Sequence, residues 1–322
     1  MKKFLLGLFL FGIGTVYAFN DLCPGEYGLS AEWLYMISSI DQPYFTIVSS
    51  SATDMEGERK ANAQGWHSGY RLEGRYRFCN EENDFLVRWT HIPEFKAQKA
   101  ASGNLFVVFT QPDNDATGAG EMTIRDKTDF YYFEALFGQK AIERRRFNVA
   151  LQAGIQFCHL GFKEEVTFIP DPLSNARSLE MESHFWGIGP EIGADCTYCL
   201  MDCWDLVGRG SVAFLASRRE AKFNQPGAIK VVDVHNEAYW HLVPAGNLRF
   251  GLNYLREQKG FNCFGCRFGG LTFNFEAGYE FIVCHKGVER IYFVDELNDG
   301  QSFNEEMDFV LHGPYVHLGF AF

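Results

Sequence analysis

The C-terminal stretch of the chain, residues 309–322, reads F-V-L-H-G-P-Y-V-H-L-G-F-A-F and decides the fold. Counting back from the last residue in steps of two places an apolar set on one face of a strand: Val316, Leu318, Phe320 and Phe322. A soluble protein rarely stops inside an apolar strand, because chain ends usually fray into water. A closed barrel in an outer membrane pairs its last strand with its first and leaves no edge. The stretch therefore favours such a barrel over its alternative, a buried final strand of a soluble all-β domain.

The opposite end of the chain has the pattern of a secretory signal peptide. Lys2 and Lys3 precede an uncharged apolar run, residues 4–14, and small residues at a V-x-A step end at Ala18. The apolar run is shorter than the ~20 residues that a permanent membrane helix requires. We expect cleavage after Ala18, with an uncleaved anchor as the alternative. The predicted domains are a signal peptide, residues 1–18, and a single barrel, residues 19–322, exported to the outer membrane of a Gram-negative bacterium.

The composition excludes some classes of protein and favours others. The formal net charge is −12 and no Lys/Arg tract is present, so nucleic acid is not an expected partner. No segment after the signal approaches ~18 uninterrupted apolar residues, so no transmembrane helix is predicted. The chain has 32 Phe and 14 Tyr, which suit the aromatic girdles of a barrel in contact with lipid, and 32 Gly, which suit strongly curved strands.

Period-two alternation marks the strands, and residues 66–78 show it most clearly. One face there is mainly apolar and aromatic, while the other carries His67, Arg71, Glu73, Arg75 and Arg77. A soluble sandwich would show the same alternation, so this pattern alone does not separate the two folds. Ten segments alternate in this way: 27–37, 66–78, 85–95, 128–137, 147–158, 184–195, 205–217, 238–256, 271–283 and 309–322.

The connections between these ten segments alternate in length. Long ones follow the first, third, fifth, seventh and ninth segments, as expected for long outer loops and short periplasmic turns. An even number of strands also returns the C-terminus to the periplasmic side. The predicted fold is an all-β transmembrane antiparallel barrel of about ten strands, or twelve if Leu105–Phe109 and a partner segment enter the wall.

The charged faces of the strands are expected to line the lumen, because charges facing lipid are costly. The predicted pore-lining residues are Glu32, Arg71, Glu73, Arg75, Arg77, Arg88, Arg209, Arg249, Glu276 and Glu280. They indicate a porin-like function, the passive diffusion of small polar solutes. The alternative is that these charges pair with each other and plug the barrel. Eight strands close around side chains and sixteen to eighteen leave a channel, so ten or twelve lie between.

All nine cysteines follow the signal, and an exported, oxidising location favours disulfides. Seven of them are expected at the periplasmic rim, in short turns or before the first strand: Cys23, Cys79, Cys196, Cys199, Cys203, Cys263 and Cys266. Only Cys158 and Cys284 fall at outer strand ends. We expect disulfides within or between barrels, hence envelope partners or a homo-oligomer, because an odd count leaves one thiol free or bridged to a partner. The compartment argues against a zinc site on the two C-x-x-C pairs, so no metal is expected.

An enzymatic function has weak support. Some ten-stranded outer-membrane barrels are proteases with acidic and histidine pairs at the outer rim, and this chain has Asp113-x-Asp115 and Asp233-x-His235 in its outer segments. Both patterns are short and common, so we expect no catalytic residues, no cofactor and no enzyme. A barrel protease and a surface adhesin that uses the outer segments remain the alternatives.

With these segments located, the chain resembles the Legionella-type major outer membrane protein family, which also occurs in chlamydia-related bacteria. The resembling stretches are Phe185–Asp195, Gly208–Ala216, His241–Tyr254 and the terminal strand. The resemblance implies a pore-forming protein whose cysteines cross-link the envelope. The chain departs from the family at Glu191, where Arg or Leu is frequent after Pro190, so the resemblance carries no ion preference.

The terminal strand also fits the aromatic C-terminal signal by which barrel-assembly machinery recognises its clients. Leu318, Phe320 and Phe322 are the predicted signal residues. His317 occupies a position where such signals often have Gly.

Overall fold

A computed structural model describes most of the chain after the N-terminal segment. The residues described are 27–40, 44–51, 56–61, 65–79, 82–107, 117–171, 176–201, 203–226, 231–258, 261–263, 266–268, 271–293 and 302–321. The predicted signal peptide, residues 1–18, lies outside them. Within these ranges no helix is long and apolar enough to span a membrane.

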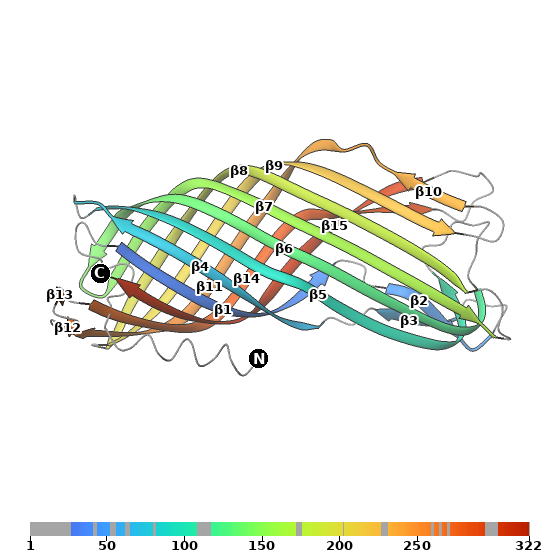
Figure 1. The fold of residues 1–322 in the computed structure, drawn as a ribbon, viewed down its shortest axis with the longest axis horizontal. Helices are drawn as coiled ribbons and strands as arrows, with labels where there is room; N and C mark the ends of the chain where they lie inside the picture. The colour runs from blue at the N-terminus through green and yellow to red at the C-terminus, as the bar shows by residue number, and fades with distance from the viewer. Residues whose placement is uncertain are drawn as a thin grey trace.

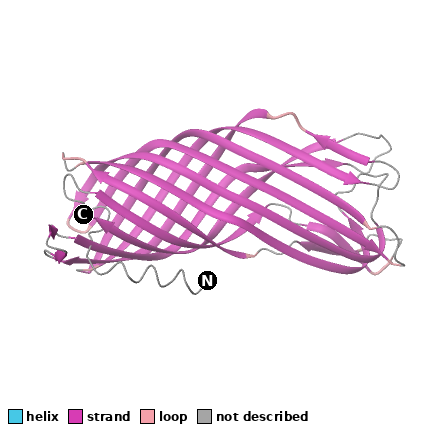
Figure 2. Cartoon of the chain, viewed as in Figure 1, coloured by secondary structure: helices cyan, strands magenta, loops and turns pink. Residues whose placement is uncertain are grey.

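Ten strands form one closed ring in which every neighbouring pair is antiparallel (Figures 1 and 2). Their order around the ring is β5-β4-β1-β15-β14-β11-β9-β8-β7-β6, and β6 pairs with β5. The strands are β1 (Tyr27–Ile40), β4 (Trp66–Arg77), β5 (Asn83–Val107), β6 (Thr117–Arg144), β7 (Phe147–Pro170), β8 (Arg177–Met201), β9 (Trp204–Pro226), β11 (Tyr239–Gln258), β14 (Leu271–Phe293) and β15 (Ser302–Ala321). The predicted all-β barrel of ten strands is confirmed.

The last strand pairs with the first, as the sequence predicted. Leu29 lies opposite Phe320, and Trp33 lies opposite Val316, in the β1–β15 ladder. On its other side β15 pairs with β14, so that neither edge of the terminal strand is exposed. The backbone donors and acceptors of the wall are therefore satisfied without water, which a lipid environment requires.

Five short strands add to the ends of the ring. At one end, β2 (Tyr44–Ser49) pairs with β3 (Gly57–Ala61) and with β5, and β10 (Val231–His235) pairs with β9. At the other end, β12 (Phe261–Cys263) pairs with β13 (Cys266–Phe268), close to the C-terminus (Figure 1). We call the end that carries β2, β3 and β10 the outer end, and the end that carries the C-terminus the periplasmic end.

Several predicted loops are in fact strand. Residues 96–107 and 117–127, parts of the predicted connection 96–127, form the outer halves of β5 and β6, and Leu105 belongs to β5 rather than to an additional wall strand. The twelve-strand alternative is therefore wrong. β6 has 28 residues, whereas a transmembrane strand needs only about 9–11, so the barrel extends well beyond the bilayer. These outer halves carry polar residues on the outside and apolar residues such as Leu105, Met122 and Ile124 on the inside, the reverse of the pattern of a membrane strand.

An apolar belt with aromatic borders encircles the periplasmic part of the barrel. Tyr27 contacts Tyr76 at 4.9 Å between ring centroids near one border. At the other border Tyr35 stacks on Trp66 at 5.1 Å, and Trp186 meets Trp240 edge-on at 5.5 Å. Large apolar side chains stay exposed between these borders, including Leu29, Leu72, Ile155, Ile192, Leu248 and Phe250. This belt has the character of a lipid-facing surface.

Beyond the outer border the same strands carry charges on their outside. Lys163 forms ion pairs with Glu180 and Glu182, and Lys222 pairs with Glu220 at 3.2 Å. Such an exterior suits water rather than hydrocarbon. The change from apolar to charged side chains therefore locates the outer surface of the membrane along the barrel.

Candidate functional site

The ten predicted luminal residues all point into the barrel. All except Arg209 are buried, and the Arg209 side chain retains only 19% exposure. They lie in the periplasmic half, on β1, β4, β5, β9, β11 and β14, together with Asp84, Glu134, Glu191 and Asp195. The candidate site is therefore the lumen itself, and its contacts decide whether it is open.

Arg71 on β4 is the centre of the first group of contacts. Its guanidinium donates to Glu280 on β14 through two nitrogens at 2.7 and 3.0 Å, and to Glu32 on β1 at 2.9 Å. The remaining donors reach Thr90 at 2.7 Å and the hydroxyl of Tyr132 at 2.5 Å. This arginine thus connects strands on different sides of the ring through charge-assisted bonds.

Glu32 joins this group to a second one around Arg249 on β11. Arg249 donates to Glu32 at 2.7 Å and to Glu276 at 2.7 and 3.0 Å, and its guanidinium lies 3.9 Å from the ring centre of Tyr315. The Tyr315 hydroxyl donates to Glu276 at 2.5 Å, and a ring nitrogen of His317 lies 2.9 Å from Glu32. The carboxylate of Glu32 therefore has three cationic or hydrogen-bonding neighbours.

A third group occupies the side of the lumen formed by β4 to β9. Arg88 bonds Glu73 at 2.8 Å and Glu134 at 3.0 Å. Arg209 bonds Asp195 at 2.7 Å and lies 3.6 Å from Glu73. Side chains of opposite sign therefore alternate across the interior and neutralise one another.

The two remaining predicted arginines are held in the same way. Arg75 lies 3.5 Å from both Asp84 and Asp195, and Arg77 lies 3.3 Å from Asp84. Glu191, where the chain departs from the family pattern, also faces the lumen and is buried there. The luminal charges fill the space as pairs, and this is the plugged arrangement that the sequence left as an alternative to an open pore.

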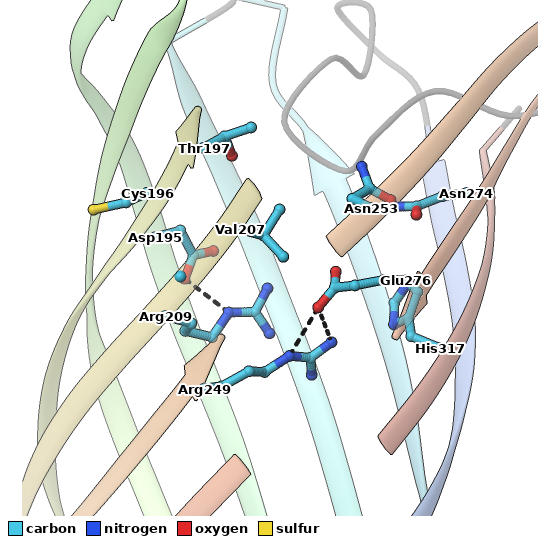
Figure 3. Close-up of a pocket in the computed structure, with 11 residues that line it drawn as sticks. Asp195, Cys196, Thr197, Val207, Arg209, Arg249, Asn253, Asn274, Glu276 and His317 are labelled. Carbon is cyan, nitrogen blue, oxygen red and sulfur yellow. Dashed lines mark hydrogen bonds and ion pairs between the residues drawn. The ribbon is translucent and has the colours of Figure 1, made fainter. Parts of the chain in front are cut away.

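A small cavity remains at the periplasmic end of the lumen. It has a volume of about 40 Å³ and lies between the Arg209–Asp195 pair and the Arg249–Glu276 pair, with Asn253, Asn274 and His317 on its other side (Figure 3). Ordinary ligand sites occupy ~300 Å³ or more. The cavity has room for water and none for a sugar or an amino acid.

An apolar layer crosses the lumen on the outer side of the charged groups. Every wall strand except β4 contributes to it, and it includes Leu34, Met36, Phe130, Phe185, Leu215, Val243, Phe309 and Leu311. The rings of Phe130 and Phe309 lie 5.7 Å apart. Since apolar side chains exclude water, this layer closes the barrel a second time.

Part of β14 forms a third closure, which sequence reasoning missed. Its ladder with β15 shifts register between Cys284 and Val288, and Lys286 there has a φ of 55°. Residues 287–291 are buried without alternation, and β14 contacts β7, β8 and β9, which are not its neighbours in the ring. We call residues 284–293 the plug segment, because residues 287–291 are buried in the barrel interior, although the His285 and Lys286 side chains stay half-exposed.

Polar contacts hold the plug segment in place. Arg219 on β9 donates to the Lys286 carbonyl at 2.7 Å and to Glu306 on β15 at 2.5 Å. The Glu289 backbone N–H donates to the Ser183 hydroxyl on β8 at 3.1 Å. The sequence contains one signal of this segment: residues 287–293, G-V-E-R-I-Y-F, have charges amid apolar residues without the alternation of a wall strand, and they fall in the predicted connection between segments 271–283 and 309–322.

The cysteines are arranged differently from the prediction. Cys79 and Cys203 lie exposed in turns, but Cys196 and Cys199 belong to strand β8. Among the described side chains no cysteine is in a disulfide, and this holds for Cys79, Cys158, Cys196, Cys199, Cys203 and Cys284. Cys263 on β12 pairs with Cys266 on β13 through the backbone, and the structure does not describe their side chains. Cys23 lies outside the described residues.

The remaining predicted residues are at the two ends of the barrel. Leu318 and Phe320 face outward near the periplasmic end, with Phe320 exposed, and Phe322 lies outside the described residues. Asp233 and His235 lie on the exposed face of β10, whereas Val232 and Val234 face the apolar interior. Asp113 and Asp115 lie outside the described residues. Of the two residue pairs that suggested a protease, the pair that the structure describes, Asp233 and His235, is therefore turned away from the barrel interior.

Comparison with known proteins identifies one family. A model of the Legionella pneumophila major outer membrane protein precursor matches residues 23–322. No curated protein matches the chain.

Solved structures of outer-membrane barrels are similar at low identity. The outer membrane protease OmpT from Escherichia coli has a TM-score of 0.48 and 8% identity, with 94% of this chain and 97% of that chain covered. The toluene transporter TodX of Pseudomonas putida has a TM-score of 0.35 and 9% identity, covering 96% and 92%. A FadL homologue from Pseudomonas aeruginosa has a TM-score of 0.27 and 8% identity, covering 94% and 90%. None of these similarities carries an inference about activity.

Proposed function

For a chain that belongs to the Legionella pneumophila major outer membrane protein family, we propose the function of a closed outer-membrane barrel that supports the envelope and presents its outer extension at the cell surface. One observation carries the proposal: the charged groups, the apolar layer and the plug segment close the described lumen in succession. A barrel closed in this way does not act as a passive porin. Its exposed parts, the long outer halves of the strands, are then the surfaces available for contacts with partners.

The permeability of proteoliposomes tests this proposal. We expect liposomes that contain the refolded full-length protein to swell in arabinose no faster than protein-free liposomes. An open porin of known exclusion limit, reconstituted in parallel, gives the positive control. Swelling that rises with protein content and falls with sugar size would overturn the proposal and favour the porin function.

A gated pore is the second candidate, and the plug segment favours it. The segment belongs to a single β14–β15 hairpin and is held partly by polar contacts from Arg219, which a conformational change can break. The charged groups beneath it would then give the lumen its selectivity. Replacing Arg219 and Glu306 together by alanine removes the polar contacts that hold the plug segment. Solute flux through this variant, but not through the wild type, would support gating. A heat-modifiable variant without solute flux would exclude opening by release of these contacts.

The proposal assigns three kinds of partner. The apolar belt contacts outer-membrane lipid, and the barrel-assembly machinery binds the terminal strand through Leu318, Phe320 and Phe322 after a signal peptide directs export. Cys79 and Cys203, exposed in turns, are the thiols best placed to bridge to envelope partners or to another copy. Non-reducing electrophoresis of isolated envelopes tests the bridging: a ladder that disappears in a Cys79→Ser/Cys203→Ser variant supports it, and monomer alone excludes it.

The proposal includes no catalytic reaction. The outward position of Asp233 and His235 on β10 supports this, because a hydrolytic pair has to face a bound substrate in a protected site. Cleavage of basic peptides by the refolded protein that is abolished in Asp233→Asn would show that the protein is a protease.

A further inference from the structure

Three consecutive arginines connect β6 to β7 at the periplasmic end of the barrel (Figure 1). Arg144 is the last residue of β6, and Arg145 and Arg146 form the turn that leads to Phe147, the first residue of β7. All three arginines are exposed. We call residues 144–146 the basic turn. It is an exception in a chain whose formal net charge is −12.

The arginines of the basic turn differ from those of the lumen in their partners. The luminal arginines form ion pairs, as Arg88 does with Glu134 at 3.0 Å. Among the residues that the structure describes, no carboxylate forms an ion pair with the basic turn, and Glu143, which precedes it, lies 3.5 Å from Lys140 instead. The three positive charges are therefore available to an anionic ligand.

The basic turn directly adjoins the apolar belt on the outside of the barrel. Arg144 lies opposite Phe147, and Phe147 lies opposite Tyr198 on β8. Tyr198 in turn lies opposite Leu206 on β9. Residues opposite each other in a sheet share a face, and these three apolar neighbours are 38%, 42% and 48% exposed. Arg144 thus stands at the end of a row of side chains that face lipid.

Neighbouring residues hold the basic turn at the depth of the lipid headgroups. The backbone N–H of Cys199 on β8 donates to the Arg146 carbonyl at 2.8 Å, which ties the turn to the next strand. On the following strands the rings of Trp204 and Tyr254 lie 5.1 Å apart. Trp and Tyr are enriched where a membrane meets water. An arginine at this depth keeps its stem along apolar surface and its guanidinium among the headgroups.

We infer that the basic turn binds the phosphate groups of anionic phospholipids in the periplasmic leaflet of the outer membrane. The planar guanidinium of arginine suits this ligand, because it donates two parallel hydrogen bonds to phosphate oxygens. Anionic lipids also attract basic residues that lie near the membrane surface. The inference adds a headgroup preference to the lipid contact of the apolar belt, and it is independent of whether the lumen is closed or gated.

An acidic periplasmic protein is the other class of ligand that these charges attract. The position of the basic turn favours lipid, because the row that ends at Arg144 meets acyl chains along its length. A phospholipid whose chains lie against Phe147 and Tyr198 brings its phosphate to the arginines. A protein would have to displace that lipid to reach Arg144.

Lipid retention by the refolded, heat-modifiable protein in detergent tests the inference. The protein is mixed with equimolar phosphatidylglycerol and phosphatidylcholine of identical acyl chains, and native mass spectrometry counts each bound lipid. We expect phosphatidylglycerol to be retained at least about fivefold more, since one basic residue near an anionic surface contributes roughly this factor. The Arg144→Gln/Arg145→Gln/Arg146→Gln variant should retain both lipids about equally, and an unchanged preference in it would overturn the inference.

The matched control removes three positive charges from the outer extension. Lys96, Arg125 and Arg177 are exposed there, and Lys96→Gln/Arg125→Gln/Arg177→Gln should keep the wild-type preference. Replacement of residues 144–146 by lysine should keep most of it, because the charge remains. An equal loss in the outer variant would show that net charge, and not the basic turn, selects the lipid.

Two further outcomes separate lipid from other anions. Inorganic phosphate in large excess should leave the retained phosphatidylglycerol unchanged, because it has no acyl chain to hold it beside the apolar row. Displacement by phosphate would show a site for free anions and overturn the assignment to lipid. Equal retention of both lipids by the wild type would also overturn it, and would leave an acidic protein as the class of ligand.

Discussion

Arg71 on β4 donates hydrogen bonds to both carboxylate oxygens of Glu280 on β14, at 2.7 and 3.0 Å, across a barrel interior that both side chains fill. β1 and β15 separate these strands in the ring. The pair therefore fixes the distance between two parts of the wall. Its burial also means that neither charge can lose the other without a large free-energy cost.

We predict that Arg71→Met destabilises the folded barrel by about 3–5 kcal/mol, because the buried carboxylate of Glu280 then loses its bidentate partner, while Glu32 keeps Arg249. Reversible unfolding of the refolded protein in denaturant measures this free energy. Lys96→Ala is the control, because the Lys96 side chain is 66% exposed in its pair with Glu94 and should contribute less than about 1 kcal/mol. Equal stability of Arg71→Met and wild type would show that the luminal charges are solvated rather than paired.

Glycines on the inner face make room for Tyr315, which leads to a second prediction. A Cβ at Gly278 would lie 2.2 Å from the Phe250 carbonyl oxygen and 2.7 Å from the Tyr315 hydroxyl. Gly278→Ala should therefore displace Tyr315 from Glu276 and destabilise the barrel by about 1–3 kcal/mol, measured by unfolding in denaturant. Gly210→Ala is the matched control, since its Cβ would meet nothing closer than 3.8 Å and should leave stability unchanged.

The outer extension should give the barrel a pH-dependent stability. Burial, reinforced by the nearby Glu164 and opposed by Arg290, raises the pKa of Asp126 to about 8. The folded protein then binds more protons than the unfolded chain between pH ~4 and pH ~8, so stability falls as pH rises through this window. Heat-modifiability midpoints across that range measure the effect. Asp126→Asn should flatten the profile, whereas the same change at Asp129, which is 43% exposed, should preserve it.

The C-terminal residues should matter more for insertion into the outer membrane than for the stability of the barrel once it has folded. Phe320 faces lipid at the periplasmic end and lies opposite Leu29 in the closing ladder. We predict that deletion of Phe322 lowers the amount of protein inserted in the outer membrane, while molecules that do insert have the wild-type thermal midpoint. Fractionation and heat-modifiability measure the two quantities. Normal insertion of the truncated chain would contradict an assembly signal at this end.

Much of the fold was predictable because lipid imposes a strict rule on membrane strands. Apolar residues at every second position, as in residues 66–78, locate the part of each strand that crosses the bilayer. The count of ten and the closure of β15 on β1 follow from that rule. Outside the bilayer the rule no longer applies, and so residues 96–107 and 117–127 have the composition of a polar connection although they continue β5 and β6.

The contents of the lumen were predictable only in part. Alternation assigned Arg71, Arg88 and Glu280 to the inner face, but it does not specify whether opposite charges meet across the barrel. That depends on ring size and register, which bring Arg71 within 3 Å of a residue 209 positions away. The plug segment was beyond prediction because a local register shift between Cys284 and Val288 turns it inward.

The conductance of single molecules in a planar lipid bilayer tests the closed lumen most directly. The refolded, heat-modifiable protein should insert and give no discrete current steps at neutral pH in 1 M salt, because paired charges, the apolar layer and the plug segment occupy the pathway. Steps of uniform size that scale with the number of inserted barrels and persist throughout the recording would contradict the closed lumen and show a constitutively open pore.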